Sequence, residues 1–358
     1  MFVRTDLIAF GVALIASLGL TIPVRRLAIR YGMVDRPGPR KVHLKPMPLL
    51  GGIAIYLGFM LAILFAVHAA PKQQIAGILS GASLVALIGF MDDGGLLHHQ
   101  IKLFVGMPAS AFFLIATGIR AQLFSQFIPG TLGAVLDGCF TVLWVMGITA
   151  SFSILDHMDG LCAGIAAVAA AFFTLEAALN GQVLVRTLAA ATFGAALGFL
   201  RWNFNPAKIF MGDGGAMFLG FLMATLGLKI RTESIEFPFN WLVSVLILVV
   251  PIFDTTLVSI SRSRRGLLPF TSPGKDHTAH RLSNLGLGHR GAVLLLYSLG
   301  ACGGALALVV SRLRPGATYA IIAALIVLAL VGIFFLETAP YERQAKLPKS
   351  TSVPSSAD

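Results

Sequence analysis

Apolar runs long enough to cross a lipid bilayer recur along the whole sequence, and they restrict the chain to one kind of fold. The hydrocarbon core of a membrane is about 30 Å thick, so a crossing helix needs about 20 mostly apolar residues. Intervals between the runs do not exceed about thirty residues. The runs lie at 6–24, 49–68, 74–91, 103–120, 131–151, 160–179, 183–201, 214–230, 240–261, 291–311 and 317–337. The sequence therefore predicts an all-α polytopic membrane protein with about eleven transmembrane helices.

Composition agrees with this class of protein. Hydrophobic residues make up 56% of the chain, charged residues only 12%, and mean hydropathy is +0.84, which is too apolar for a water-soluble protein. No small-residue cleavage site follows the first run, so we expect a retained span rather than a signal peptide. Residues 1–345 are expected to form one integral membrane domain, and 346–358, rich in Ser and Pro, a disordered cytoplasmic tail.

Positive charge is distributed unevenly between the two sides that eleven spans create. The segments 25–48, 92–102, 152–159, 201–213, 262–290 and the tail hold 19 of the 27 Lys and Arg residues. The positive-inside rule makes this side cytoplasmic, with the N-terminus outside and the C-terminus inside the inner membrane. The same rule explains the net charge of +11, so we expect a lipid bilayer rather than nucleic acid as partner. Asp137 makes the fifth span the least regular, and Asp254, near the cytoplasmic end of the ninth, is expected to pair structurally.

Five carboxylates are predicted on the cytoplasmic side. Asp92 and Asp93 end the third run, and because adjacent carboxylates repel one another, a cation beside them is favoured over simple solvation. Asp156 and Asp159 are three residues apart, so on a helical turn both face the same way. Asp213 follows the seventh run in a Gly-rich loop. Such a set is typical of a Mg²⁺-dependent phosphoryl site, with Mn²⁺ as the alternative metal.

Cationic and imidazole groups lie in two loops on this side. Arg40, Lys41 and His43 are suited either to phosphate oxygens or to anionic lipid, and the sequence leaves both alternatives open. In the 262–290 loop, His277 and His280 are three residues apart. Zinc is the rival interpretation, but hard carboxylates elsewhere and the absence of a nearby Cys favour phosphate binding or proton transfer.

Four sequence blocks resemble a known family, the polyprenyl-phosphate N-acetylhexosamine-1-phosphate transferases. They are DRPGPRKVHLKPMPLLGG from residue 35, GFMDDGGLLHHQIK from 89, LDHMDGLCAG from 155 and NFNPAKIFMGDGGAMFLG from 203. A fifth, 276–297, resembles the histidine loop of the family and the helix that follows it. The resemblance covers nearly the whole chain, and the combination of blocks makes it specific.

This resemblance implies roles for individual residues. Asp213 would bind Mg²⁺, and Phe210 would stack on the uracil of a UDP-sugar. Asp92 and Asp93 would be the paired catalytic carboxylates, one of them acting as a base toward the lipid phosphate or as a metal partner. Lys102 would contact phosphate. Further implied site residues are Asp156 and Asp159, which would orient nucleotide or metal, His277, His280 and Arg281 at the diphosphate, and Asn203 and Asn205, which would read the nucleotide or cap the turn.

Three features depart from the family pattern. A Gln that is common shortly after the Lys102 position has no match at Gly106 or Met107. Ser153 stands where Asn is usual, and Ala279 stands between His277 and His280 where a third His is common. We therefore expect altered substrate choice or turnover, while the acidic set is intact.

The implied reaction is transfer of HexNAc-1-phosphate from a UDP-sugar to undecaprenyl phosphate with release of UMP, an early step of a cell-envelope glycan. The stretch 48–52, PLLGG, resembles the GlcNAc branch more than the muramyl-pentapeptide branch. Alternatives are another UDP-sugar, a secondary transporter, which would place its acids near the midplane, and an inactive scaffold. Direct attack by the lipid phosphate is favoured over an enzyme intermediate, and the resemblance is compatible with a homodimer.

Overall fold

The computed structural model describes residues 5–35, 46–66, 72–97, 99–232, 240–268, 274–313 and 315–341. The described chain is almost wholly helical, and one short antiparallel pair joins β1 (Val34–Asp35) to β2 (Met47–Pro48). The helices are α1 (Thr5–Arg30), α2 (Gly51–Ala66), α3 (Lys72–Asp93), α4 (His99–Ile101), η1 (Lys102–Gly106), α5 (Met107–Ala116), α6 (Thr131–Leu155), α7 (Leu161–Leu179), α8 (Val183–Asn203), α9 (Gly212–Lys229), α10 (Asn240–Ile247), α11 (Val249–Arg264), α12 (Thr278–Leu282), η2 (Ser283–Leu287), α13 (Gly288–Val310) and α14 (Pro315–Thr338).

Fewer described helices than the sequence predicts are long enough to span a membrane. Seven described helices are long and apolar enough to cross a bilayer, or eight if α10 and α11, bent by 79°, form one span. A helix lies in every predicted interval, but α2 has only 16 residues, about 24 Å at 1.5 Å per residue. The all-α polytopic class is therefore confirmed, whereas the count of eleven remains a prediction.

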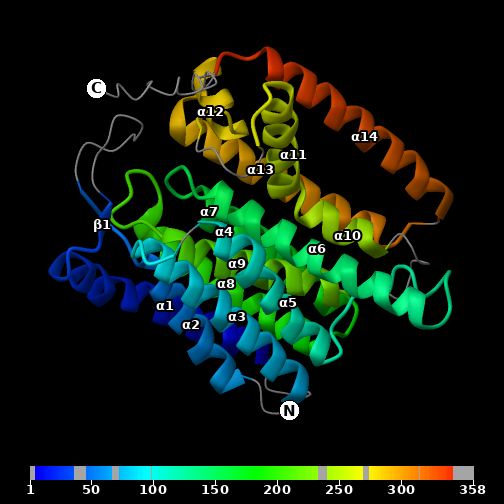
Figure 1. Ribbon diagram of the computed structural model, residues 1–358, viewed down its shortest axis with the longest axis horizontal. Coiled ribbons are helices and arrows are strands. Elements are labelled where there is room, and N and C mark those ends of the chain that lie inside the picture. Colours follow the sequence, from blue (N-terminus) through cyan, green and yellow to red (C-terminus); the bar gives the residue numbers. More distant parts are fainter. Residues whose placement is uncertain are drawn as a thin grey trace, which may run out of the picture.

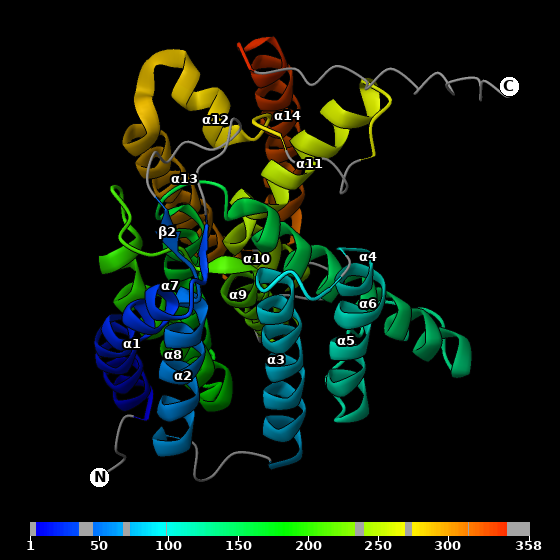
Figure 2. The same ribbon diagram turned by 60° about the vertical axis from the view of Figure 1, so that its left-hand side comes forward.

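The helix α9 forms the centre of the bundle. Every residue from Gly214 to Leu228 is buried, and α9 packs against α2, α3, α6, α7 and α8 (Figures 1 and 2). Glycines allow the helices to meet near its first turn. A Cβ on Gly52 would lie 2.3 Å from Gly215 N, and one on Gly89 would lie 2.5 Å from Gly214 Cα. Close backbone contact therefore brings the start of α2 and the end of α3 to the start of α9.

The helix α14 lies at the edge of the bundle, where it packs against α11 (Figure 1). Only 6% of its apolar window is buried within the protein. Large exposed side chains such as Leu328, Val331 and Phe334 lie along it. An apolar helix exposed in this way is expected to face lipid.

Asp137 lies in the second turn of α6 without interrupting the helix. Its carboxylate is buried and accepts the backbone N–H groups of Leu123 and Phe124 at 2.8 and 2.7 Å. The acid therefore supplies hydrogen bonds to the loop before α6, which explains a carboxylate within an apolar run.

Candidate active site

Asp213, in the first turn of α9, lies at the centre of a polar cluster to which three other helices contribute. Lys102, at the start of η1, places Nζ 2.5 Å from Asp213 Oδ2 and 2.6 Å from Asp92 Oδ2 at the end of α3. The other oxygen of Asp213 accepts the hydroxyl of Ser153, near the end of α6, at 2.6 Å. The residue that departs from the family pattern at position 153 therefore still donates a hydrogen bond to this carboxylate.

Asp93 has a different environment from its neighbour Asp92. Its Oδ1 accepts the N–H of Asp213 at 2.8 Å, and its Oδ2 accepts the N–H of Gly214 at 3.1 Å. These N–H groups lie at the start of α9, where a helix favours negative charge. Gly212 has φ +76°, and a Cβ there would lie 2.5 Å from the Asp93 carboxylate. Asp93 therefore orients the helix that carries Asp213.

Asp156 and Asp159 lie in the turn between α6 and α7. Burial, together with the negative charges of Asp213, Asp93 and Asp159, raises the pKa of Asp156 to about 8. The turn thus carries more negative charge than its surroundings stabilise, which a bound cation would relieve. Asp159, in contrast, has hydrogen-bond donors in the segment 203–211. Its Oδ2 accepts hydrogen bonds from Asn205 Nδ2 at 3.1 Å and from the Ala207 N–H at 2.9 Å.

The two asparagines of the segment 203–211 hold that segment in place. Asn203 Oδ1 accepts the N–H of Gly160 at 3.1 Å, and its Nδ2 donates to Ile209 O at 3.0 Å. Asn205 Oδ1 accepts Arg290 Nε at 3.0 Å. These contacts correspond to the alternative in which the two asparagines cap the turn rather than read the nucleotide.

Phe210 is anchored through its backbone. Its N–H donates to Pro48 O at 2.8 Å, and its carbonyl accepts the N–H of Gly51 at 3.0 Å. The side chain is half-buried beside the start of α9. A stacking role for the ring therefore stays a prediction.

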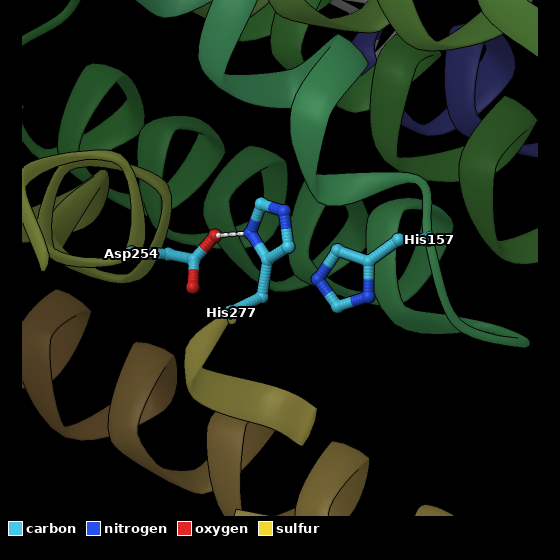
Figure 3. A group of neighbouring side chains, drawn as sticks. All are labelled: His157, Asp254 and His277. Atoms are coloured by element: carbon cyan, nitrogen blue, oxygen red, sulfur yellow. Dashed lines mark hydrogen bonds and ion pairs between the residues drawn. The ribbon is translucent and has the colours of Figure 1, made fainter. Parts of the chain in front are cut away.

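A stack of histidines borders the acidic cluster. The His157 ring lies 4.2 Å from that of His277 and 4.6 Å from that of His280, centroid to centroid. His277 Nδ1 is 2.9 Å from Asp254 Oδ2 (Figure 3). Asp254 Oδ1 accepts Thr278 N–H at 2.7 Å. Asp254 was expected to pair with a nearby Arg or a backbone group; it pairs with the backbone at the start of α12 and with the His277 imidazole. His157 was missed, yet its position between Asp156 and Asp159 in the sequence was a usable signal.

Known proteins resemble this chain over most of its length. A family model described as Glycosyl transferase family 4 matches residues 75–231. A probable undecaprenyl-phosphate N-acetylglucosaminyl 1-phosphate transferase of Bacillus subtilis is 37% identical over 82% of this chain and 81% of its own length. Decaprenyl-phosphate N-acetylglucosaminephosphotransferase of Mycolicibacterium smegmatis is 33% identical over 76% and 74%. Undecaprenyl-phosphate alpha-N-acetylglucosaminyl 1-phosphate transferase of Escherichia coli K12 is 27% identical over 82% and 80%.

The chain belongs to glycosyl transferase family 4. This confirms the resemblance drawn from the sequence blocks, and it makes the protein a membrane-embedded transferase. The span matched by the family model includes Asp92, Lys102, Asp156, Asp159 and Asp213. The central acids therefore lie within the part of the chain that defines this glycosyltransferase family.

Two groups of side chains in this family 4 protein have metal-binding chemistry. The carboxylates around Asp213 are hard oxygen donors suited to Mg²⁺ or Mn²⁺, and the Lys102 ammonium already lies between two of them. His157, Asp254 and His277 bring three ligand atoms within 4.8 Å of one another, an arrangement closer to the zinc alternative. Burial, and then the charges of His277 and His280, lower the pKa of His157 well below its usual value, which keeps its imidazole neutral.

Arg281 has a structural environment. The side chain is fully buried, donates from Nε to Asp276 O at 2.8 Å and from NH1 to Glu337 Oε1 at 2.7 Å, and lies 3.9 Å from the Tyr341 ring centroid. It therefore ties α12 to the end of α14, and its predicted contact with substrate stays a prediction. Three other predicted contacts, Arg40, Lys41 and His43, lie outside the described residues, as does the tail 346–358.

Proposed function

We propose that this protein transfers HexNAc-1-phosphate, with GlcNAc as the preferred sugar, from a UDP-sugar to undecaprenyl phosphate. An oxygen of the acceptor phosphate attacks the β-phosphorus of the donor, the bond from that phosphorus to the bridging oxygen breaks, and UMP leaves. The observation that carries the proposal is the Asp92–Lys102–Asp213 cluster at helix ends in a chain whose relatives are named for this transfer.

Residues of the cluster would divide the work of charge neutralisation and positioning. Bound Mg²⁺ would neutralise diphosphate charge, and Asp213 is the carboxylate we assign to hold it. Asp92 is less engaged in backbone contacts than Asp93, so we assign it to the acceptor phosphate. Lys102 would move from the two carboxylates toward phosphate oxygens, because its ammonium group can neutralise either anion.

The remaining predicted residues would shape the donor site. His277, oriented by Asp254, and His280 would donate hydrogen bonds to diphosphate oxygens, with His157 packed between their rings. Phe210 would stack on uracil. Asp93, Asp159, Asn203 and Asn205 would act through the backbone of α9 and of 203–211 rather than by touching the substrate.

Location and orientation are part of the proposal. We assign the protein to the bacterial inner membrane, with the acidic helix ends and the C-terminus cytoplasmic. Helix ends, rather than the midplane, carry these acids, which disfavours the transporter alternative. The Ser153–Asp213 hydrogen bond removes one reason to consider an inactive scaffold.

A donor panel tests the sugar and the acceptor together. Purified full-length protein with Mg²⁺ and undecaprenyl phosphate is given UDP-GlcNAc, UDP-GalNAc or UDP-MurNAc-pentapeptide, each labelled in the sugar. We expect label in a chloroform-soluble product with UDP-GlcNAc, dependent on added undecaprenyl phosphate. A labelled lipid with a different donor alone would correct the sugar, and the absence of product with every donor would refute the enzymatic proposal.

A further inference from the structure

A shallow apolar groove runs along the outside of the bundle between α1 and α8, which pack side by side (Figure 2). Its volume is about 660 Å³. Leu14, Leu18 and Ile22 from α1 and Leu197 from α8 line most of its length, and polar groups are confined to one end. The groove therefore has the apolar lining that an acyl-chain site requires.

Glycines give the groove its depth. Gly198 brings the two helices close together, because a Cβ there would lie 2.5 Å from Leu14 O. Gly19 lines the groove itself, and a Cβ on it would meet no atom within 4 Å. The space above Gly19 is thus open, and a side chain placed there would enter the groove without displacing protein atoms.

Cationic side chains gather at one end of the groove. Arg201 and Lys208 lie 5.8 and 5.4 Å from the Trp202 ring centroid, and Arg25 Nε donates to Lys208 O at 3.0 Å. Trp202 is fixed by its own bond from Nε1 to Leu18 O at 3.0 Å. A ring flanked by cations at the end of an apolar groove is suited to the headgroup level of a membrane.

We propose that this α1–α8 groove binds an anionic glycerophospholipid, with an acyl chain along the groove and the headgroup phosphate at Arg201 and Lys208. Charge complementarity selects this occupant over zwitterionic lipid, since two cations converge where no acid pairs with Arg201 or Lys208 in the described chain. The groove opens to the outside of the bundle, so bilayer lipid reaches it directly. The proposal does not depend on the reaction above, because its readout is lipid binding.

Quenching of tryptophan fluorescence by brominated lipid tests the site. Full-length protein is reconstituted in phosphatidylcholine vesicles that contain an equal content of either brominated phosphatidylglycerol or brominated phosphatidylcholine. We expect stronger quenching by phosphatidylglycerol, with the excess arising at Trp202. Arg201→Gln should lower this preference by about fivefold, the contribution of one cation near an anionic headgroup. Trp144 and Trp241, which pack against each other, supply a background that the substitution does not alter.

Two glycine variants form the matched pair. Gly19→Leu fills the groove and should abolish the excess quenching, whereas Gly11→Leu, on the same helix and also facing open space, should retain it. Equal quenching by the two lipids, or an unchanged excess in Gly19→Leu, would overturn the proposal. Loss of the excess on addition of a small amount of undecaprenyl phosphate would also overturn it, by identifying the acceptor lipid as the occupant.

Discussion

Asp213→Asn is expected to lower turnover on the order of 10³-fold while the protein remains folded. The substitution removes the negative charge that we assign to Mg²⁺ and that pairs with Lys102 at 2.5 Å. Asn keeps the shape of the side chain and one oxygen to accept the Ser153 hydroxyl. Initial rates of lipid-linked product formation over a range of Mg²⁺ concentrations measure the effect, and the thermal midpoint in detergent reports folding.

Two further variants serve as comparisons for the loss of turnover in Asp213→Asn. Ser153→Ala should cost about tenfold, because it removes a hydrogen bond that orients Asp213 and leaves its charge in place. Asp6→Asn also removes one carboxylate charge, but Asp6 lies at the start of α1 beside Arg186, so turnover should not change. Undiminished turnover in Asp213→Asn would remove this residue from the metal site.

Asp276→Ala is expected to destabilise the protein by about 3–5 kcal/mol, the usual cost of removing one partner from a buried ion pair. Asp276 is 2% exposed, and its oxygens accept Arg262 NH2 at 2.9 Å and Arg265 NH2 at 2.6 Å. The substitution removes the carboxylate that pairs with the buried Arg262 guanidinium. The free energy of unfolding in a denaturing-detergent titration measures the loss. Arg264→Ala, which breaks an exposed pair with Glu337 at 3.7 Å, should change stability by less than about 1 kcal/mol.

The same ion pairs give stability a defined dependence on pH. Burial opposes ionisation of Asp276, but hydrogen bonds and charge from Arg262, with help from Arg265 and His277, lower its pKa from 3.8 to about 2. A carboxyl group whose pKa is lower in the folded than in the unfolded chain stabilises the fold at pH values above its unfolded pKa. The contribution of Asp276 to the free energy of unfolding is therefore complete at neutral pH and is lost as the pH falls from about 4 toward 2. An equal loss of stability on acidification in Asp276→Ala and in the unsubstituted protein would contradict this assignment.

Helical class and the common location of the acids followed from the sequence because both depend on local patterns. Apolar runs of bilayer length specify helices wherever they occur, and loop parity assigned Asp92, Asp156 and Asp213 to one side. Contacts between helices that are far apart in the sequence could not be predicted from local patterns. The sequence treats Asp92 and Asp93 as equivalent, yet only packing of α3 against α9 gives Asp93 the backbone N–H groups.

The histidine stack shows the same limit. His157 comes from the turn after α6 and His277 from the start of α12, and their contact depends on how α6, α11 and α13 pack. Arg281 directly follows His280 in the sequence, but a helical turn directs neighbouring residues to different faces, and its side chain contacts Glu337 and Asp276. The bend between α10 and α11 was likewise absent from the periodicity, which treats 240–261 as one span.

The most direct test of the central claim follows the two phosphorus atoms of the donor separately. Purified protein with Mg²⁺ and undecaprenyl phosphate is supplied with UDP-GlcNAc labelled at either the α- or the β-phosphorus. We expect the β-label to move into the lipid fraction in an amount equal to the UMP released, while the α-label stays in UMP. Retention of both labels in soluble UDP, with the sugar alone transferred to lipid or to water, would contradict it.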